Sequence, residues 1–241
     1  MSSLPVLLVE HEAQCPPGWV GDWLLDAGCR LDVRRPYRGD TLPEGLDGHA
    51  GMVVLGGSMN VYAHRAHPWL LQVRQLVRRA ADEQVPVLGI CLGHQLAAVS
   101  LGGAVRRNPR GQQLGLLRIG WTPEAADDPL TSAAVSARSA LHWNSDLVVV
   151  APPGTEVLAE TTAGELQAAR FAPTVWGVQW HPEVDVATVT AWAEEDRAAE
   201  RGLDVDECVA AVAAAREELH ESWRPLAARF AAMTREASRA W

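Results

Sequence analysis

The stretch from residue 87 to residue 95 constrains the fold of this chain more than any other. It reads Val-Leu-Gly-Ile-Cys-Leu-Gly-His-Gln: an apolar run reaches Gly89, a cysteine stands at position 91, and a second glycine follows at Gly93. This spacing predicts a buried strand that turns sharply into a helix and holds Cys91 out at the turn. Glycines flank the cysteine because larger side chains would crowd such a bend. The helix would direct its free main-chain N–H groups toward whatever the thiol meets.

Strand and helix patterns alternate through the first hundred residues. Apolar runs predict strands at 5–9, 31–34, 52–55 and 85–90, and helical spacing of apolar residues predicts helices at 19–27, 69–83 and 92–101. The uninterrupted run at 85–90 is typical of a strand buried on both faces of a parallel sheet. We therefore expect an α/β fold with a doubly wound, mostly parallel sheet flanked by helices.

Short strands replace helices between residues 105 and 180. Turn signals such as Pro152-Pro153-Gly154 separate strand-like segments at 114–121, 140–143, 147–150, 156–160, 166–171 and 175–180. We expect a small antiparallel section added to the parallel sheet. The last strand would deliver His181 back to that sheet.

The segment after Pro182 is rich in alanine and charge and predicts a C-terminal helical extension. Helices are expected at 186–201, 205–222 and 225–239, with Asp204 or Asp206 capping the second and Pro225 separating the last two. An apolar stripe along them either packs on the same domain or offers a surface for a partner or a second copy, which would make a homo-oligomer. The stripe consists of Val209, Val212, Leu219, Trp223, Leu226, Phe230 and Met233. We expect one domain over residues 1–190 and the extension over 191–241.

The composition excludes several classes of function. All 21 basic residues are arginine, so neither a Schiff-base lysine nor a P-loop lysine can operate. The formal net charge of −9 argues against nucleic acid as a main partner. The four cysteines form no CxxC pair and no zinc-spaced cluster, and we expect neither a metal nor another cofactor. No apolar run approaches the ~20 residues of a membrane span, which predicts a cytoplasmic protein with no membrane partner.

A histidine and a carboxylate stand together ninety residues after the cysteine. Glu183 follows His181 by two residues, on the same side of an extended segment, and the intervening proline stiffens the link. Glu183 can accept from one ring nitrogen and leave the other to serve a thiol. Cys91, His181 and Glu183 are therefore predicted to act as nucleophile, base and orienting carboxylate. Structural roles are expected for Cys15, Cys29, Cys208 and His142.

These motifs resemble those of the class I, or triad, glutamine amidotransferases. The family's Gly-x-Cys-x-Gly-x-Gln elbow is matched by residues 89–95, its His-Pro-Glu by residues 181–183 and its early Gly-Gly turn by residues 56–57, in the same order and with similar spacing. The resemblance covers roughly residues 5–190 and implies a flavodoxin-like fold. By overall pattern the chain is most similar to stand-alone members that are like the glutaminase domain of GMP synthase.

The resemblance also implies roles for individual residues. The main-chain N–H groups of Gly57 and Leu92 would hold the oxyanion that develops during the reaction. Gly56 and Gln95 would contact the substrate. Ser145 and Asp146 would belong to a loop that grips its α-amino and α-carboxylate groups. The chain departs from the family at Ser58, where many relatives have proline.

The activity implied by the resemblance is hydrolysis of the glutamine side-chain amide through a γ-glutamyl thioester on Cys91. We expect no synthase domain here, because the chain has no P-loop and no second large α/β unit. A separate synthase or ligase subunit would receive the ammonia, or the protein would act alone. Two alternatives stay open: hydrolysis of another γ-glutamyl amide or peptide on the same triad, and a non-catalytic regulatory or binding module that keeps the fold.

Overall fold

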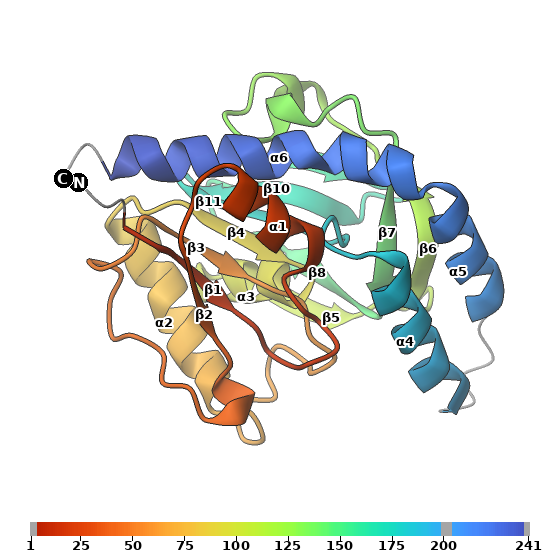
Figure 1. The fold of residues 1–241 in the computed structure, drawn as a ribbon, viewed down its shortest axis with the longest axis horizontal. Coiled ribbons are helices and arrows are strands. Elements are labelled where there is room, and N and C mark those ends of the chain that lie inside the picture. Colours follow the sequence, from red (N-terminus) through yellow and green to blue (C-terminus); the bar gives the residue numbers. More distant parts are fainter. Residues whose placement is uncertain (1–3, 199–203, 239–241) are drawn as a thin grey trace.

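Seven strands form the central sheet in the order β2-β1-β3-β4-β11-β10-β9 (Figure 1). The structure is a computed structural model that describes residues 4–198 and 204–238. β2, β1, β3, β4 and β11 are parallel, and β10 and β9 add an antiparallel edge. The strands span Val6–Val9 (β1), Leu31–Arg34 (β2), Gly51–Val54 (β3), Val87–Ile90 (β4), Glu156–Glu160 (β9), Leu166–Ala172 (β10) and Val175–Val178 (β11). The expected mostly parallel sheet is confirmed.

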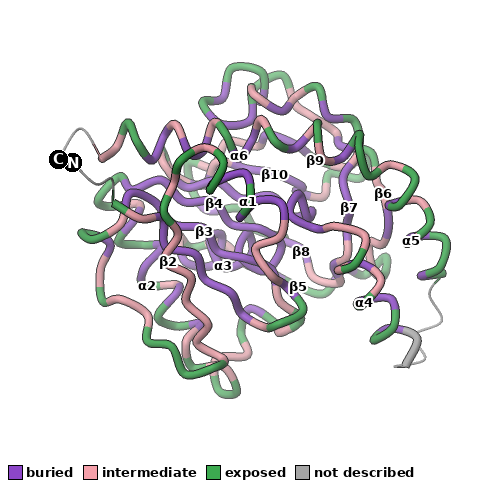
Figure 2. Tube along the Cα trace, viewed as in Figure 1, coloured by how far each residue is buried: buried purple, intermediate pink, exposed green. Residues whose placement is uncertain are grey.

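The parallel strands alternate their side chains between two hydrophobic cores. Residues 6 and 8 of β1 belong to one core and residues 7 and 9 to the other. Helices α1 and α6 cover the first face of the sheet, and α2 and α3 cover the second (Figure 1). These helices span Gly18–Asp26 (α1), Trp69–Asp82 (α2), Leu92–Ser100 (α3) and Arg216–Ala237 (α6). The central strands are therefore buried along their whole length (Figure 2), which is why they read as uninterrupted apolar runs.

The antiparallel section is more divided than we expect from the sequence. β9 and β10 extend the main sheet, but β5 pairs with β8 and β6 with β7 in two separate ladders. β5 is missing from the sequence prediction because it buries only Val105 and exposes two arginines, so it shows no apolar run. The remaining elements span Ala104–Arg107 (β5), Gln113–Arg118 (β6), Ser139–Asn144 (β7), Asp146–Val150 (β8), Pro36–Arg38 (η1), Pro123–Ala126 (η2) and Thr131–Ala133 (η3).

The C-terminal helices begin and end differently from the prediction. α4 spans Val186–Ala198 and runs through the expected domain boundary at residue 190, and α5 spans Val205–Ala214. The expected helix ends at 199–201 and at 239 lie outside the described residues. The side chain of Asp204 accepts from the N–H of Glu207 at 3.2 Å, so one of the two expected caps is confirmed. No helix among the described residues is both long enough and apolar enough to cross a lipid bilayer.

Pro225 does not separate two helices, contrary to the prediction. It lies inside α6, and the break falls at Ala215 instead. A proline inside a helix removes one main-chain hydrogen bond and would normally bend or end it. Here Trp223 and Leu226, on either side of Pro225, are both buried, so packing holds the helix continuous. The chain turns at Ala215 because α5 packs on α4 and β6, whereas α6 packs on α1.

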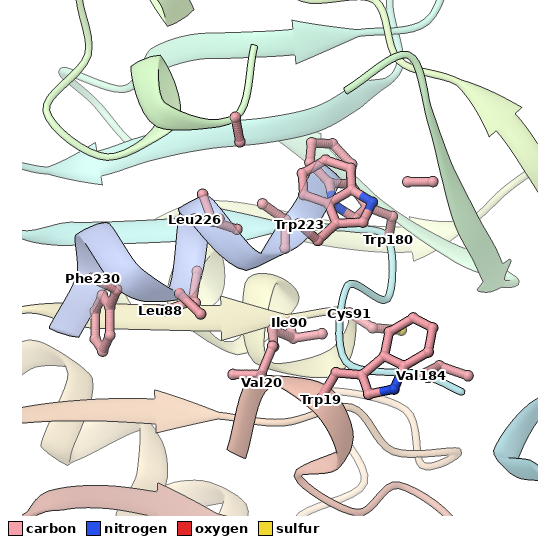
Figure 3. Close-up of a cluster of buried hydrophobic side chains, with 14 of the residues drawn as sticks. Trp19, Val20, Leu88, Ile90, Cys91, Trp180, Val184, Trp223, Leu226 and Phe230 are labelled. Carbon is pink, nitrogen blue, oxygen red and sulfur yellow. The ribbon is translucent and has the colours of Figure 1, made fainter. Parts of the chain in front are cut away.

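The predicted apolar stripe packs within the chain itself. Figure 3 shows Trp223, Leu226 and Phe230 of α6 lying over Leu88 and Ile90 of β4. The Trp223 ring also contacts that of Trp180, with ring centroids 5.2 Å apart. The first alternative for the stripe, packing on the domain's own flank, is therefore confirmed.

Replacing Trp223 by alanine should destabilise the protein strongly. The side chain is 1% exposed and lies in the core between α6 and the sheet. Truncating a buried tryptophan costs about 3–5 kcal/mol of unfolding free energy, measurable by urea denaturation. Leu71→Ala is the control, because Leu71 is 43% exposed on α2 and its truncation should change stability by only about 0.5 kcal/mol. Equal losses in the two variants would contradict the packing assigned to α6.

Candidate active site

Cys91 lies on a strained turn between β4 and α3. Its backbone has φ 50° and ψ −103°, a conformation that costs energy for a residue with a side chain. A methyl group built on Gly93 would lie 2.0 Å from the carbonyl oxygen of Val54, and one built on Gly89 would lie 2.5 Å from that of Gly93. Gly93 is therefore required because the turn packs directly against β3, and Gly89 because β4 packs directly against the first turn of α3. The result is a thiol at the edge of the core, beside Trp19 and Val184 (Figure 3).

His181 comes to the same place because β11 lies next to β4. The two strands are parallel, and the N–H of Cys91 donates to the carbonyl of Val178 at 2.9 Å, three residues before His181. A methyl group built on Gly56 would lie 2.9 Å from Cε1 of His181 and 3.7 Å from Cβ of Cys91. The imidazole and the thiol thus lie side by side against Gly56, which has no room for a side chain.

Glu183 holds one nitrogen of the buried imidazole. Its Oε1 lies 2.7 Å from Nδ1 of His181, and both side chains are almost fully buried. Burial opposes protonation, but the charges of Glu183 and Cys91 outweigh it and raise the pKa of His181 above its ordinary range. The arrangement favours an imidazolium that faces sulfur with Nε2 and carboxylate with Nδ1.

A carboxylate fixes the loop that carries the glycine pair. Oε1 of Glu12 accepts from the main-chain N–H of Ser58 at 2.7 Å, and Oε2 accepts from its hydroxyl at 2.6 Å. A methyl group built on Gly57 would lie 2.9 Å from the Leu92 side chain, so this loop touches the start of α3. Gly57 and Leu92, whose main-chain N–H groups are expected to hold an oxyanion, are therefore residues in contact. A proline at position 58 would lack both the main-chain N–H and the hydroxyl group that Ser58 donates to Glu12.

The residues predicted to hold the rest of a substrate also gather here. The side-chain amide of Gln95 donates to the carbonyl of Asp146 at 3.1 Å, which links α3 to the β7–β8 turn. The Asp146 carboxylate accepts from the Asn60 side chain at 2.7 Å. Ser145 belongs to the same turn, and its carbonyl accepts from the N–H of Asn108 at 2.8 Å.

A cavity of about 560 Å³ lies beside Cys91 and His181. Another, of about 610 Å³ around Leu46 and Arg79, contains no predicted site residue, so the chemistry of the lining and not the volume selects the first. The first cavity is lined by Cys15, Gly57, Ser58, Met59, Asn60, Cys91, Gln95, Arg107, Gln112, Trp143, Asn144, Ser145, Asp146, His181, Trp192, Glu195 and Asp196. Within residues 4–198 and 204–238 no three histidines, cysteines or carboxylates gather into a metal-binding group.

Sequence reasoning misses several residues of this cavity. Cys15, expected only to pack, is buried and also lines the cavity, where its thiol lies 3.4 Å from Glu12. Glu12 follows a parallel strand, the edge at which α/β proteins place ligands, so it could have been found from that position. Trp192 carries no such signal, because only the packing of α4 brings it to the cavity. His142 is buried among core residues, as expected of a structural histidine.

A family model confirms what the motifs suggest. The model for "Glutamine amidotransferase class-I" matches residues 21–192, well over half of the chain. The chain belongs to the class I glutamine amidotransferase family. The match includes the elbow, the His-Pro-Glu segment and most of the cavity lining, and it ends within α4.

Two relatives show the range within this family. The glutamine amidotransferase-like protein YfeJ of Salmonella typhimurium is 30% identical over 187 residues, covering 76% of this chain and 77% of that protein. One subunit of the glutamine-hydrolysing GMP synthase of Saccharolobus solfataricus is 42% identical over 104 residues, covering 42% of this chain and 52% of that subunit. The similarity therefore spans about half of the GMP synthase subunit.

Solved structures of other amidotransferases share the fold. The amidotransferase of Thermotoga maritima superposes with a TM-score of 0.83 at 22% identity, covering 96% of this chain and 99% of that one. The amidotransferase of Methylobacillus flagellatus gives 0.77 at 24% identity, covering 96% of both chains. At this identity the likeness establishes the fold, including the C-terminal helices that lie outside the family model.

Buried histidines near the site should make stability fall in mild acid. Burial lowers the pKa of His94 and His142 to about 4 and that of His11 to about 3. Below about pH 6.5 each of these imidazoles is protonated in the unfolded chain but stays neutral in the folded chain. By pH 5 each one therefore lowers the free energy of unfolding by roughly 2 kcal/mol. His181 changes the slope between pH 6.5 and 5.0 little, because its raised pKa gives stability that is nearly constant below pH 6.5 and is lost progressively as the pH rises from about 6.5 to about 10.

Urea denaturation at pH 7.5, 6.5 and 5.0 measures this effect. His142→Gln should flatten the decrease between pH 6.5 and 5.0, whatever it does to stability at pH 7.5. Leu71→Ala is the comparison, because Leu71 is exposed on α2 and carries no titrating group, so this variant should keep the slope of the parent protein. A parent stability that does not fall between pH 6.5 and 5.0 would contradict neutral burial of these rings.

Proposed function

We propose that the chain hydrolyses the side-chain amide of glutamine through a covalent thioester on Cys91. One observation carries the proposal. A thiol on a strained turn lies beside an imidazole that Glu183 holds, and both open onto a cavity large enough for an amino-acid substrate. Because strain is retained at functional sites when the surroundings enforce it, the turn itself favours this interpretation.

The chemistry follows from the positions of the groups. The Cys91 sulfur attacks the amide carbon, and a C–S bond forms as the carbonyl electrons move onto oxygen. The N–H groups of Gly57 and Leu92 stabilise that oxyanion. His181 gives its proton to the departing nitrogen as the C–N bond breaks, which releases ammonia. The same imidazole then takes a proton from water, which attacks the thioester and releases glutamate and the thiolate.

The part of the cavity lined by Gln95 and the β7–β8 turn would hold the amino-acid part of the substrate. We assign this role to Gln95, Ser145 and Asp146, and we assign to Gly56 a main-chain contact to the substrate beside the thiol and the imidazole. The hydrogen bond from Gln95 to the Asp146 carbonyl supports the assignment, since it fixes the loop relative to the elbow. Asn60 supports the same loop through the Asp146 carboxylate.

A separate subunit would receive the ammonia. The relative from Saccharolobus solfataricus is named as one subunit of a GMP synthase, which supports an arrangement in two chains. The second candidate function is hydrolysis of another γ-glutamyl amide. It is favoured by the volume of the cavity, because ammonia needs about the space of one water molecule, roughly 30 Å³.

Cys91→Ala should abolish hydrolysis while leaving the fold intact. We expect the rate of ammonia release from glutamine to fall by at least roughly 10⁴-fold, as for other enzymes that lose their nucleophile. Cys29→Ala is the matched control, because Cys29 is a half-buried free cysteine that does not line the cavity. A diazo-ketone analogue of glutamine should add its mass to Cys91 alone. Ammonia release that survives in Cys91→Ala would refute the nucleophile assignment.

Glu12 should act as a positioning residue for the oxyanion. Glu12→Ala removes both hydrogen bonds to Ser58 and frees the loop that carries Gly57. Losing an oxyanion donor outright costs about 10²–10³ in kcat, so a displaced donor should lower kcat by roughly 10- to 100-fold with little change in KM.

A double-mutant cycle with Ser58→Ala separates this role from general destabilisation. The two substitutions should not be additive, because Ser58→Ala removes one of the two hydrogen bonds that Glu12→Ala also removes. Affinity for an aldehyde analogue of glutamine, which forms an oxyanion on the thiol, should fall in parallel with kcat. Equal losses in kcat and stability, with the aldehyde still bound tightly, would show that Glu12 is merely structural.

A further inference from the structure

Two chemically distinct sets of side chains line the cavity beside Cys91 and His181. Gln95, Ser145 and Asp146 form the first set, assigned above to the amino-acid part of the substrate. The second set forms a wall of the cavity and consists of Trp143 and, from helix α4, Trp192, Glu195 and Asp196. Glutamine needs little from this wall, because its leaving group is ammonia.

This wall lies directly beside the imidazole of His181. The ring of Trp192 packs edge-on against the imidazole of His181, with centroids 4.7 Å apart. Trp143 packs against Trp192 in turn, with centroids 5.7 Å apart. Since His181 would protonate the departing nitrogen, any substituent on that nitrogen would meet these two indoles.

Carboxylates accompany the indoles. Asp196 is buried and accepts from Nε1 of Trp143 at 3.1 Å, which fixes the plane of that ring. Glu195 lies at the exposed rim of the same wall. Besides the thiol and imidazole, the charged side chains among the described lining residues are three carboxylates and one guanidinium, that of Arg107. Indole faces and carboxylates together attract organic cations.

Asn144, the residue after Trp143, keeps an open acceptor in the same cavity. Its Nδ2 donates to Gln113 and to the Asp146 carbonyl, whereas its buried Oδ1 has no hydrogen-bond donor among the described residues, so Oδ1 is available to a ligand N–H group. Glu195 and Asp196 lie beyond residue 192, where the match to the family model ends, so the acidic part of the wall lies outside the part of the chain that the family model matches.

We propose that the site takes γ-glutamyl amides of aliphatic diamines, whose second nitrogen is a cation held by Trp143, Trp192 and Glu195. The inference rests on the proposed function and names its substrate class. The Cys91 sulfur displaces the diamine, His181 protonates the nitrogen that leaves, and water cleaves the thioester. One amide and one water thus give one glutamate and one free diamine.

A charge-matched series of substrates tests the proposal. The three compounds are the γ-glutamyl amides of 1,4-diaminobutane, of n-pentylamine and of 4-aminobutanoate, which place a cation, a methyl group or an anion at similar distances from the amide. We expect kcat/KM for the cationic amide to exceed that for the neutral one by about 10-fold, the size of a partly desolvated cation–π and charge interaction. The anionic amide should be the poorest substrate.

Glu195→Gln should lower the ratio of cationic to neutral kcat/KM by about threefold, because an exposed carboxylate contributes modestly. Glu194→Gln is the matched control, since Glu194 is exposed on the same helix but does not line the cavity. It should leave the ratio unchanged. Because each ratio is taken within one variant, loss of folded protein cannot produce the effect.

The outcomes separate this inference from the proposed function. If glutamine is hydrolysed and the cationic amide shows no advantage over the neutral one, the diamine inference is overturned and the glutaminase proposal stands. An equal fall in the ratio for Glu194→Gln and Glu195→Gln would also overturn it. If folded protein hydrolyses none of the amides and the diazo-ketone does not label Cys91, the proposed function itself fails.

Discussion

The close approach of β3 to the turn after β4 is the constraint on which the rest of the site depends. The backbone at Gly93 packs so tightly on Val54 that no side chain fits between them. This contact forces Cys91 into its unusual conformation and brings the loop after β3 beside the first turn of α3. β11 then pairs with β4 on the other side and carries His181 to the same edge. Three neighbouring parallel strands thus deliver the glycine pair, the thiol and the imidazole.

Sequence alone predicts this part of the molecule well because each signal is local. An apolar run buried on both faces, a glycine on each side of a cysteine, and a carboxylate two residues after a histidine all fix their own geometry. Right-handed crossovers predict a doubly wound sheet with helices on its faces, whereas the order of the strands is known only from the structure. The family resemblance adds the roles of Gln95, Ser145 and Asp146, and the structure brings all three to the cavity.

Interactions between distant segments escape prediction for a physical reason. Pro225 is a local signal for the end of a helix, but the buried contacts of Trp223 and Leu226 on either side outweigh it. The break between the last two helices falls at Ala215 instead. Glu12 reaches Ser58 across 46 residues, and no pattern near either one announces the pair. Trp192 reaches the cavity only because α4 folds back over it. Side chains that depend on tertiary packing become visible only when the packing is known.

The contact between Trp180 and Trp223 connects the candidate active site to helix α6. Trp180 is the residue immediately before His181, and its ring lies against that of Trp223 on α6. A displacement of the last helix would reach the imidazole through one pair of packed indoles and one peptide bond. Helix α6 therefore supports the base from within the same hydrophobic core that holds Cys91, so the position of His181 depends on the C-terminal helix as well as on β11.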